Sequence, residues 1–157
     1  MQSTFAQFVL IVFKIQSLVV ILMAIPSYSS EDYQALMRQG VNLLSESEYE
    51  SALNVFEKVT TQDPSNAQAY FFYGVTLNRL GRSVEALEKI DKSLFLITTL
   101  NLKPHPDIAF ERGLALLRLN QFELAKNSFI TYENSNPGRG QTSEFLGRAY
   151  IGLGEYD

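Results

Sequence analysis

The chain has 157 residues and no cysteine, so we expect one domain with a sizeable core. The lack of cysteine excludes disulfides, thiolate zinc sites, a cysteine nucleophile and a lipidated lipoprotein N-terminus. With 13 basic and 17 acidic side chains the net charge is −4. Nucleic-acid binding needs a basic face to release counterions, and none is visible, so we expect no nucleic-acid partner.

The first thirty residues are strongly apolar and predict an export signal. Residues 5–25 carry one charge, that of Lys14, and no acidic side chain. Lys14 would supply the positive charge of a secretory signal, residues 18–25 its apolar core, and Pro26 the break before cleavage near Ser29. We favour this interpretation, which places the mature chain outside the cytoplasm, in the periplasm or secreted.

The same segment has a second interpretation, in which residues 1–30 form an uncleaved membrane anchor. Residues 5–25 are long enough to cross a bilayer. Lys14 would then lie near the middle of the span, which costs about 2.5–3.5 kcal/mol on an insertion scale. Contact with a membrane is expected only through this segment, and only if it is not cleaved.

After residue 30 the chain repeats one arrangement of small and large side chains. A glycine is followed twelve residues later by an alanine and sixteen residues later by a phenylalanine or isoleucine. Two of the three intervals between successive frame glycines, Gly40 to Gly74 and Gly113 to Gly147, are 34 residues long. Small residues let two helices approach closely, and the large residues fill the space around their crossing. The complete frames are Gly40, Ala52 and Phe56; Gly74, Ala86 and Ile90; and Gly113, Ala125 and Phe129, and Gly147 opens a partial fourth.

Each frame predicts two helices joined by a short turn. In the first unit the turn lies at 45–48, and Pro64 ends the second helix because proline cannot continue the hydrogen-bond ladder. Ser65 and Ser83 are the expected N-caps of the two helices that follow, and Asn120 makes the turn of the third unit. The units are about 31–66, 67–105, 106–139 and, in part, 140–157.

This frame resembles the tetratricopeptide repeat, whose unit is a pair of antiparallel helices at this period. The resemblance covers residues 31–157 and implies an all-α, TPR-like α-solenoid of stacked antiparallel helix pairs in a right-handed superhelix. One unit cannot bury its own apolar face, so the units stack and the core becomes continuous. Gln39, Ala109, Arg112 and Ser143 depart from the family pattern, and we expect weaker packing there.

The interval from Gly74 to Gly113 is 39 residues, five more than the period of 34. The excess falls in residues 95–106, which predict a lengthened second helix and then a connection closed by two prolines. Such insertions can be functional loops, but we favour a tolerated insertion whose leucines pack on the neighbouring unit. His105 lies here and is the only histidine. We expect it to be a surface-loop residue rather than a metal ligand or a catalytic residue.

In tetratricopeptide repeat proteins the first helices line a concave groove, and the resemblance implies that this groove binds a protein or peptide segment. The matched positions are mainly apolar, which suits an amphipathic helix or an extended apolar segment. The lysines and asparagines with which some members hold a peptide carboxylate are missing here. Alternatively, several of these side chains are partly buried between adjacent first helices or covered by the N-terminal segment. The predicted groove residues are Met37, Val41, Leu44, Phe71, Val75, Asn78, Phe110, Leu114 and Leu117, with Glu144, Arg148 and Ile151 in the partial unit.

The predicted function is a non-catalytic protein–protein interaction scaffold without cofactor or metal, in which Phe71 and Phe110 anchor the partner. A second hypothesis starts from residues 153–157, which match the turn after a first helix. With no second helix to cover that first helix, we expect the chain to be a fragment. It would then be the N-terminal repeat module of a longer enzyme or membrane-complex subunit.

Overall fold

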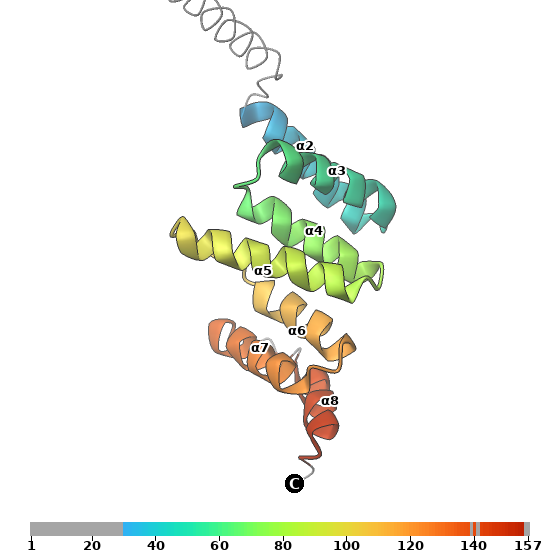
Figure 1. Ribbon diagram of the computed structural model, residues 1–157, viewed down its shortest axis with the longest axis vertical. Helices are drawn as coiled ribbons and strands as arrows, with labels where there is room; N and C mark the ends of the chain where they lie inside the picture. Colours follow the sequence, from blue (N-terminus) through green and yellow to red (C-terminus); the bar gives the residue numbers. More distant parts are fainter. Residues whose placement is uncertain (1–29, 139, 141, 156–157) are drawn as a thin grey trace, which may run out of the picture. The chain divides into compact units, whose positions relative to one another are not determined.

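The computed structural model describes residues 30–138, 140 and 142–155, and the regular secondary structure within them is entirely helical. The chain divides into two units, Met1–Tyr33 and Gln34–Asp157, and the predicted signal or anchor lies outside the described residues. The all-α prediction of six helices and one partial pair is confirmed (Figure 1). The helices are α2 (Ser30–Ser45), α3 (Tyr49–Gln62), α4 (Ala67–Arg79), α5 (Ser83–Thr99), α6 (Ile108–Arg118), α7 (Phe122–Ser135) and α8 (Ser143–Leu153).

Each first helix, α2, α4, α6 and α8, ends in the same kind of turn. Seven positions after the glycine of the frame, one residue has a left-handed backbone, and the N–H of the next residue donates to the carbonyl five residues before it at 2.9–3.0 Å. This Schellman arrangement satisfies carbonyl groups that the helix leaves without a partner. The turns that follow the first helices therefore lie at equivalent positions in all four units. The left-handed residues are Ser47, Gly81, Asn120 and Gly154.

The starts of two helices differ from the prediction. The N-cap of α4 is Asn66, whose side chain accepts the Ala69 N–H at 3.0 Å, and the Ser65 hydroxyl instead donates to Asp63 at 2.6 Å. Ser83 is already the first residue of α5, and Arg82 occupies the N-cap position without a side-chain hydrogen bond. Both predicted caps are wrong because a capping oxygen must come from the residue immediately before the helix.

The glycine of each complete frame lies where two helices cross, as predicted. A Cβ atom built at Gly40 would lie 2.7 Å from the ring of Phe56, and one at Gly113 would lie 2.6 Å from the ring of Phe129. At Gly74 the same atom would lie 2.5 Å from Ile90. Since these large residues are fully buried, the helices of each pair are as close as an absent side chain allows.

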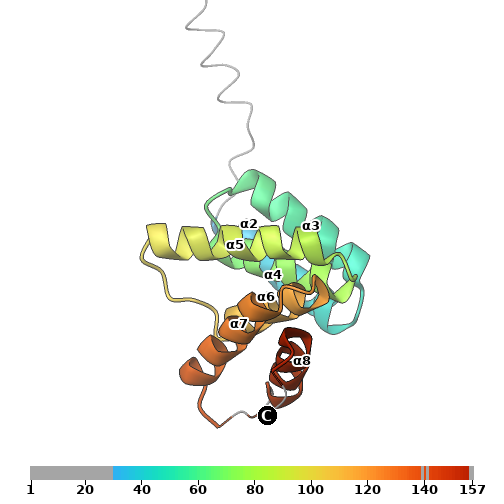
Figure 2. The same cartoon turned by 60° about the horizontal axis from the view of Figure 1, so that its bottom comes forward.

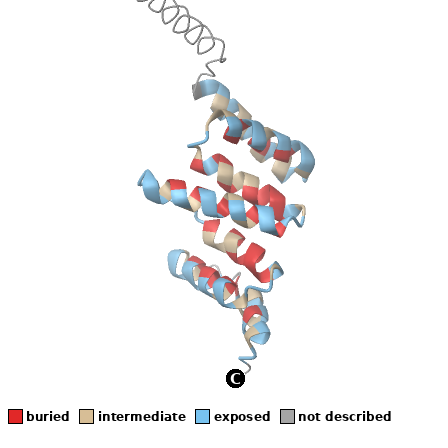
Figure 3. Cartoon of the chain, in the orientation of Figure 1, coloured by how far each residue is buried: buried red, intermediate tan, exposed pale blue. Residues whose placement is uncertain are grey.

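Buried residues from neighbouring units form shared clusters. Leu53 of α3 packs with Leu77 of α4 and Ala115 of α6, which joins three units. Figure 3 shows the buried positions concentrated on the helix faces that meet inside the stack. The core is therefore continuous through the repeats, as stacking of incomplete units requires.

The predicted lengthening of the second unit is confirmed. Helix α5 has 17 residues, whereas α3 and α7 have 14 each. It ends at Thr99, Asn101 in the following turn has a left-handed conformation, and the chain then runs through an irregular connection to α6 (Figure 2). We call residues 100–107 the insertion loop.

The partial fourth unit differs at its glycine. A Cβ atom at Gly147 would meet no other atom within 4 Å. Helix α8 packs on α7 elsewhere, where the backbone of Gly152 lies against the ring of Phe122. Among the described residues, Gly147 alone of the four frame glycines has open space around it.

This contrast predicts opposite effects of one substitution at two glycines. Gly113→Ala places a methyl group against the buried ring of Phe129 and should lower the free energy of unfolding by roughly 1–3 kcal/mol. Gly147→Ala gains helix propensity without a clash and should raise it by up to about 1 kcal/mol. Urea denaturation of both variants tests this, and equal losses of stability would contradict the close crossing at Gly113.

Candidate binding site

The predicted groove residues lie on the first helices, and we call their common surface the first-helix face. On α2 they are half-buried, whereas on α4 they are buried, with exposed fractions of 2% for Phe71 and 0% for Asn78. On α6, Phe110 is half-buried while the other two are buried. The middle of this face therefore belongs largely to the core between units, and the accessible parts are on α2, Phe110 and α8. The α8 residues Glu144, Arg148 and Ile151 are exposed.

Phe71 is covered by the chain itself. The His105 ring of the insertion loop stacks on the Phe71 ring, with centroids 4.2 Å apart and planes inclined by 23°. The Phe72 ring meets the same imidazole edge-on at 5.6 Å. In this arrangement Phe71 has no free ring face for a partner, so its predicted use as an anchor requires the loop to move.

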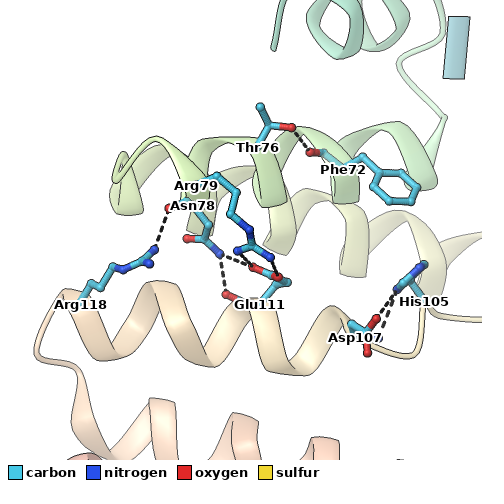
Figure 4. Close-up of polar contacts among 8 residues, drawn as sticks. All are labelled: Phe72, Thr76, Asn78, Arg79, His105, Asp107, Glu111 and Arg118. Atoms are coloured by element: carbon cyan, nitrogen blue, oxygen red, sulfur yellow. Dashed lines mark hydrogen bonds and ion pairs between the residues drawn. The ribbon is translucent and has the colours of Figure 1, made fainter. Parts of the chain in front are cut away.

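Asn78, another predicted groove residue, joins the second and third units through a buried carboxylate. Its amide Nδ2 donates to the Glu111 backbone carbonyl at 2.9 Å and to Glu111 Oε2 at 3.0 Å. Arg79 donates to both carboxylate oxygens of Glu111, at 2.7 and 3.2 Å (Figure 4). Arg118 donates to the Asn78 carbonyl at 2.8 Å. The Asn78 amide nitrogen is thus already occupied within the stack.

His105 lies in a loop, as predicted, but its ring packs against aromatic side chains. Its Nδ1 accepts the backbone N–H of Asp107 at 3.2 Å, so the neutral ring carries its proton on Nε2. Burial lowers the pKa of His105, although the carboxylates of Asp107 and Glu111 act in the opposite direction. The loop is also tied to α7, because the Asn136 amide donates to the Pro106 carbonyl at 3.2 Å.

Two hollows flank the insertion loop, and His105 contributes to both. One, of about 520 Å³, lies between the loop, the start of α4 and the end of α5. The other, of about 700 Å³, lies between the loop, α5, α6 and α7. We call the larger one the loop cleft. Both volumes fall in the range of small-ligand sites in proteins, which is roughly 300–1,000 Å³.

Solved structures with the same arrangement of helices identify the fold. The first TPR of Spaghetti (RPAP3) bound to HSP90 peptide SRMEEVD has a TM-score of 0.71 and 18% identity, over 82% of this chain and 98% of that one. The Arabidopsis OM64 TPR domain has a TM-score of 0.68 and 15% identity, over 77% and 96%. The Yersinia enterocolitica type III secretion chaperone SycD, in complex with a peptide of the translocator YopD, has a TM-score of 0.60 and 17% identity, over 80% and 92%. This is a tetratricopeptide repeat fold.

A sequence match supports the same fold for the first two units. Residues 31–97 match the tetratricopeptide repeat family model, while no curated protein matches the chain in sequence. Among the described helices of this repeat stack, none is long and apolar enough to cross a membrane. Nor do the described residues bring together three or more side chains of the kinds that hold a metal ion.

Sequence reasoning missed two features of this tetratricopeptide repeat stack. Glu111 is only 4% exposed, and the one signal for its role was a charged residue inside the apolar run of α6. Arg112, which departs from the repeat pattern, donates to Asp91 of α5 at 2.7 Å. An ion pair between units therefore stands where a leucine is usual, and only the tertiary structure places its two partners together.

The lowered pKa of His105 predicts that the stability of the fold depends on pH. Because the chain has no other histidine, replacing His105 removes this contribution alone. As the pH falls, the unfolded chain binds the proton first, at about pH 6.5. The stability due to the neutral ring is therefore present above that pH and lost as the pH falls through the lowered folded-state pKa. We expect the unfolding free energy of the wild type to decrease more between about pH 7.5 and 5.5 than that of His105→Phe, which keeps a stacking ring.

Guanidinium denaturation at several pH values measures the difference. Parallel curves for the wild type and His105→Phe would show that the stack does not discriminate between the neutral and the charged imidazole.

Proposed function

We propose that this chain is a non-catalytic interaction module that binds a protein segment on the first-helix face. Peptides are the ligands in two of the structures compared above, an HSP90 peptide in one and a YopD peptide in the other. That precedent supports a peptide as the ligand class, because the helix pairs of this chain have the same fold.

The accessible apolar side chains of the first-helix face carry the proposal. Met37 and Val41 of α2 are half-buried, and Ile151 of α8 has 61% of its surface exposed. Phe110 of α6, also half-buried, packs on Phe145 of α8 at 5.4 Å between ring centroids. Accessible apolar residues at the predicted groove positions suit an apolar or amphipathic segment, since burying them on binding removes apolar surface from water.

A matched pair of variants tests this assignment. Val41→Ser with Ile151→Ser removes two accessible apolar side chains from the first-helix face and should weaken partner recovery about ten-fold or more if they belong to the centre of an interface. The control, Val84→Ser with Leu124→Ser, changes two exposed apolar residues on the second helices α5 and α7 and should leave recovery unchanged.

The measurement is quantitative pull-down with the full chain, after circular dichroism has established that both double variants are folded. Partners recovered equally well by both double variants and the wild type would refute binding on the first-helix face. Loss with the control pair alone would place the interface on the second helices.

We further propose that this module works outside the cytoplasm, because residues 5–25 combine a long apolar run with one cationic side chain. A cleaved signal predicts a mature N-terminus near Ser29 in the periplasmic or secreted fraction. Mass spectrometry of the N-terminal peptide measures this. An intact Met1 in a membrane fraction would instead support the alternative of a membrane anchor.

A further inference from the structure

The loop cleft is a consequence of the five extra residues in the second unit. Leu94 of α5 and Pro104 of the insertion loop contribute apolar surface, and the buried Ile108 of α6 lies beneath them in the core. The opposite wall comes from α7, with the hydroxyl groups of Ser128 and Thr131. The cleft thus has an apolar part and a polar part, and at about 700 Å³ it is large enough for a small organic ligand.

The loop cleft is a different surface from the first-helix face. Arg112 lines the cleft, whereas Phe110 and Leu114 belong to the predicted groove. With about 100° of rotation per helical residue, Arg112 lies some 200° around α6 from each of them. A ligand in the cleft therefore need not compete with a partner on the first-helix face.

Two of the three charged side chains in the described lining of the loop cleft, Lys103 and Arg112, are hydrogen-bond donors. The Arg112 guanidinium is held in place by two contacts, from Nε to Asp91 at 2.7 Å and from Nη1 to the Ser128 hydroxyl at 3.2 Å. Its Nη2 group has no protein acceptor among the described residues, and neither has the Lys103 ammonium group. His105 also lines the cleft, but its ring is stacked on Phe71 and is shared with the smaller hollow. Asp91 is the only acidic residue among the described lining, and it already pairs with Arg112.

We propose that the loop cleft binds a carboxylate attached to an apolar group. Lys103 and the free Nη2 of Arg112 bind the carboxylate, since charge-assisted hydrogen bonds are stronger than neutral ones. The apolar group lies on Leu94 and Pro104, where its burial removes apolar surface from water. Two sources share this chemistry: a free amphipathic carboxylic acid, and the C-terminal residue of a peptide with an apolar side chain.

Two matched ligand pairs test the proposal on the full chain. The first compares 4-phenylbutyrate with 4-phenylbutyramide, and the second compares acetyl-Leu-Phe with a free C-terminus and the same peptide as its amide. In at least one of the two pairs, isothermal titration calorimetry should give a dissociation constant at least about ten-fold lower for the carboxylate than for the amide. A preference in the first pair assigns the site to free acids, and a preference in the second assigns it to peptide C-termini.

Variants then locate the bound carboxylate. Lys103→Gln, on the exposed loop, should weaken carboxylate binding at least about three-fold and leave amide binding unchanged. Lys92→Gln removes an exposed lysine of α5 that does not line the cleft and should leave both unchanged. Arg112→Gln should weaken carboxylate binding further, with circular dichroism as the check on folding.

Three results would overturn the proposal. The first is equal affinity of carboxylate and amide in both pairs, and the second is no binding of either carboxylate up to about 10 mM, weaker than nearly all specific sites. The third is unchanged carboxylate affinity in Lys103→Gln. Because Met37, Val41 and Ile151 lie outside the cleft lining, failure here leaves the proposed function untouched.

Discussion

The close crossing of two helices at a glycine is the constraint on which the rest of this structure depends. At Gly40, Gly74 and Gly113 the first helix lies directly against a fully buried phenylalanine or isoleucine of the second. Any side chain at the glycine would push the helices apart. Because the separation within each pair is set in this way, every pair presents a similar apolar surface, and the next pair can bury it.

Regular stacking also decides which parts of the first-helix face are available to a partner. Leu44 of α2 packs against the cluster that contains Phe71 and Val75 of α4. Apolar residues at the predicted groove positions are therefore buried where two units meet. On α8, Ile151 occupies the position equivalent to Asn78, yet it remains exposed while Asn78 is buried. Position in the repeat therefore determines the direction of a side chain, and the neighbouring unit determines its accessibility.

The insertion loop interrupts this regularity and adds the side chains of Lys103 and His105 next to the helix pairs. The His105 ring of this loop stacks on the Phe71 ring and covers it. Residues 103–106 of the loop line the loop cleft, so Lys103 and Arg112 lie in the same cleft. Five residues inserted into one unit thus lengthen α5, cover the Phe71 ring and form one side of the loop cleft.

The sequence by itself determined the helix pairs, their order, the lengthened α5 and the glycine crossings, because each depends on residues within one unit and on short-range geometry. It did not determine the exact cap at Asn66, where a shift of one residue changes which side chain reaches the free N–H groups. Only the tertiary structure decided the burial of Phe71 and the pairing of Asn78 with Glu111, which are 33 residues apart. Such contacts form when separate units stack, and no periodicity within a unit specifies which of their side chains will meet.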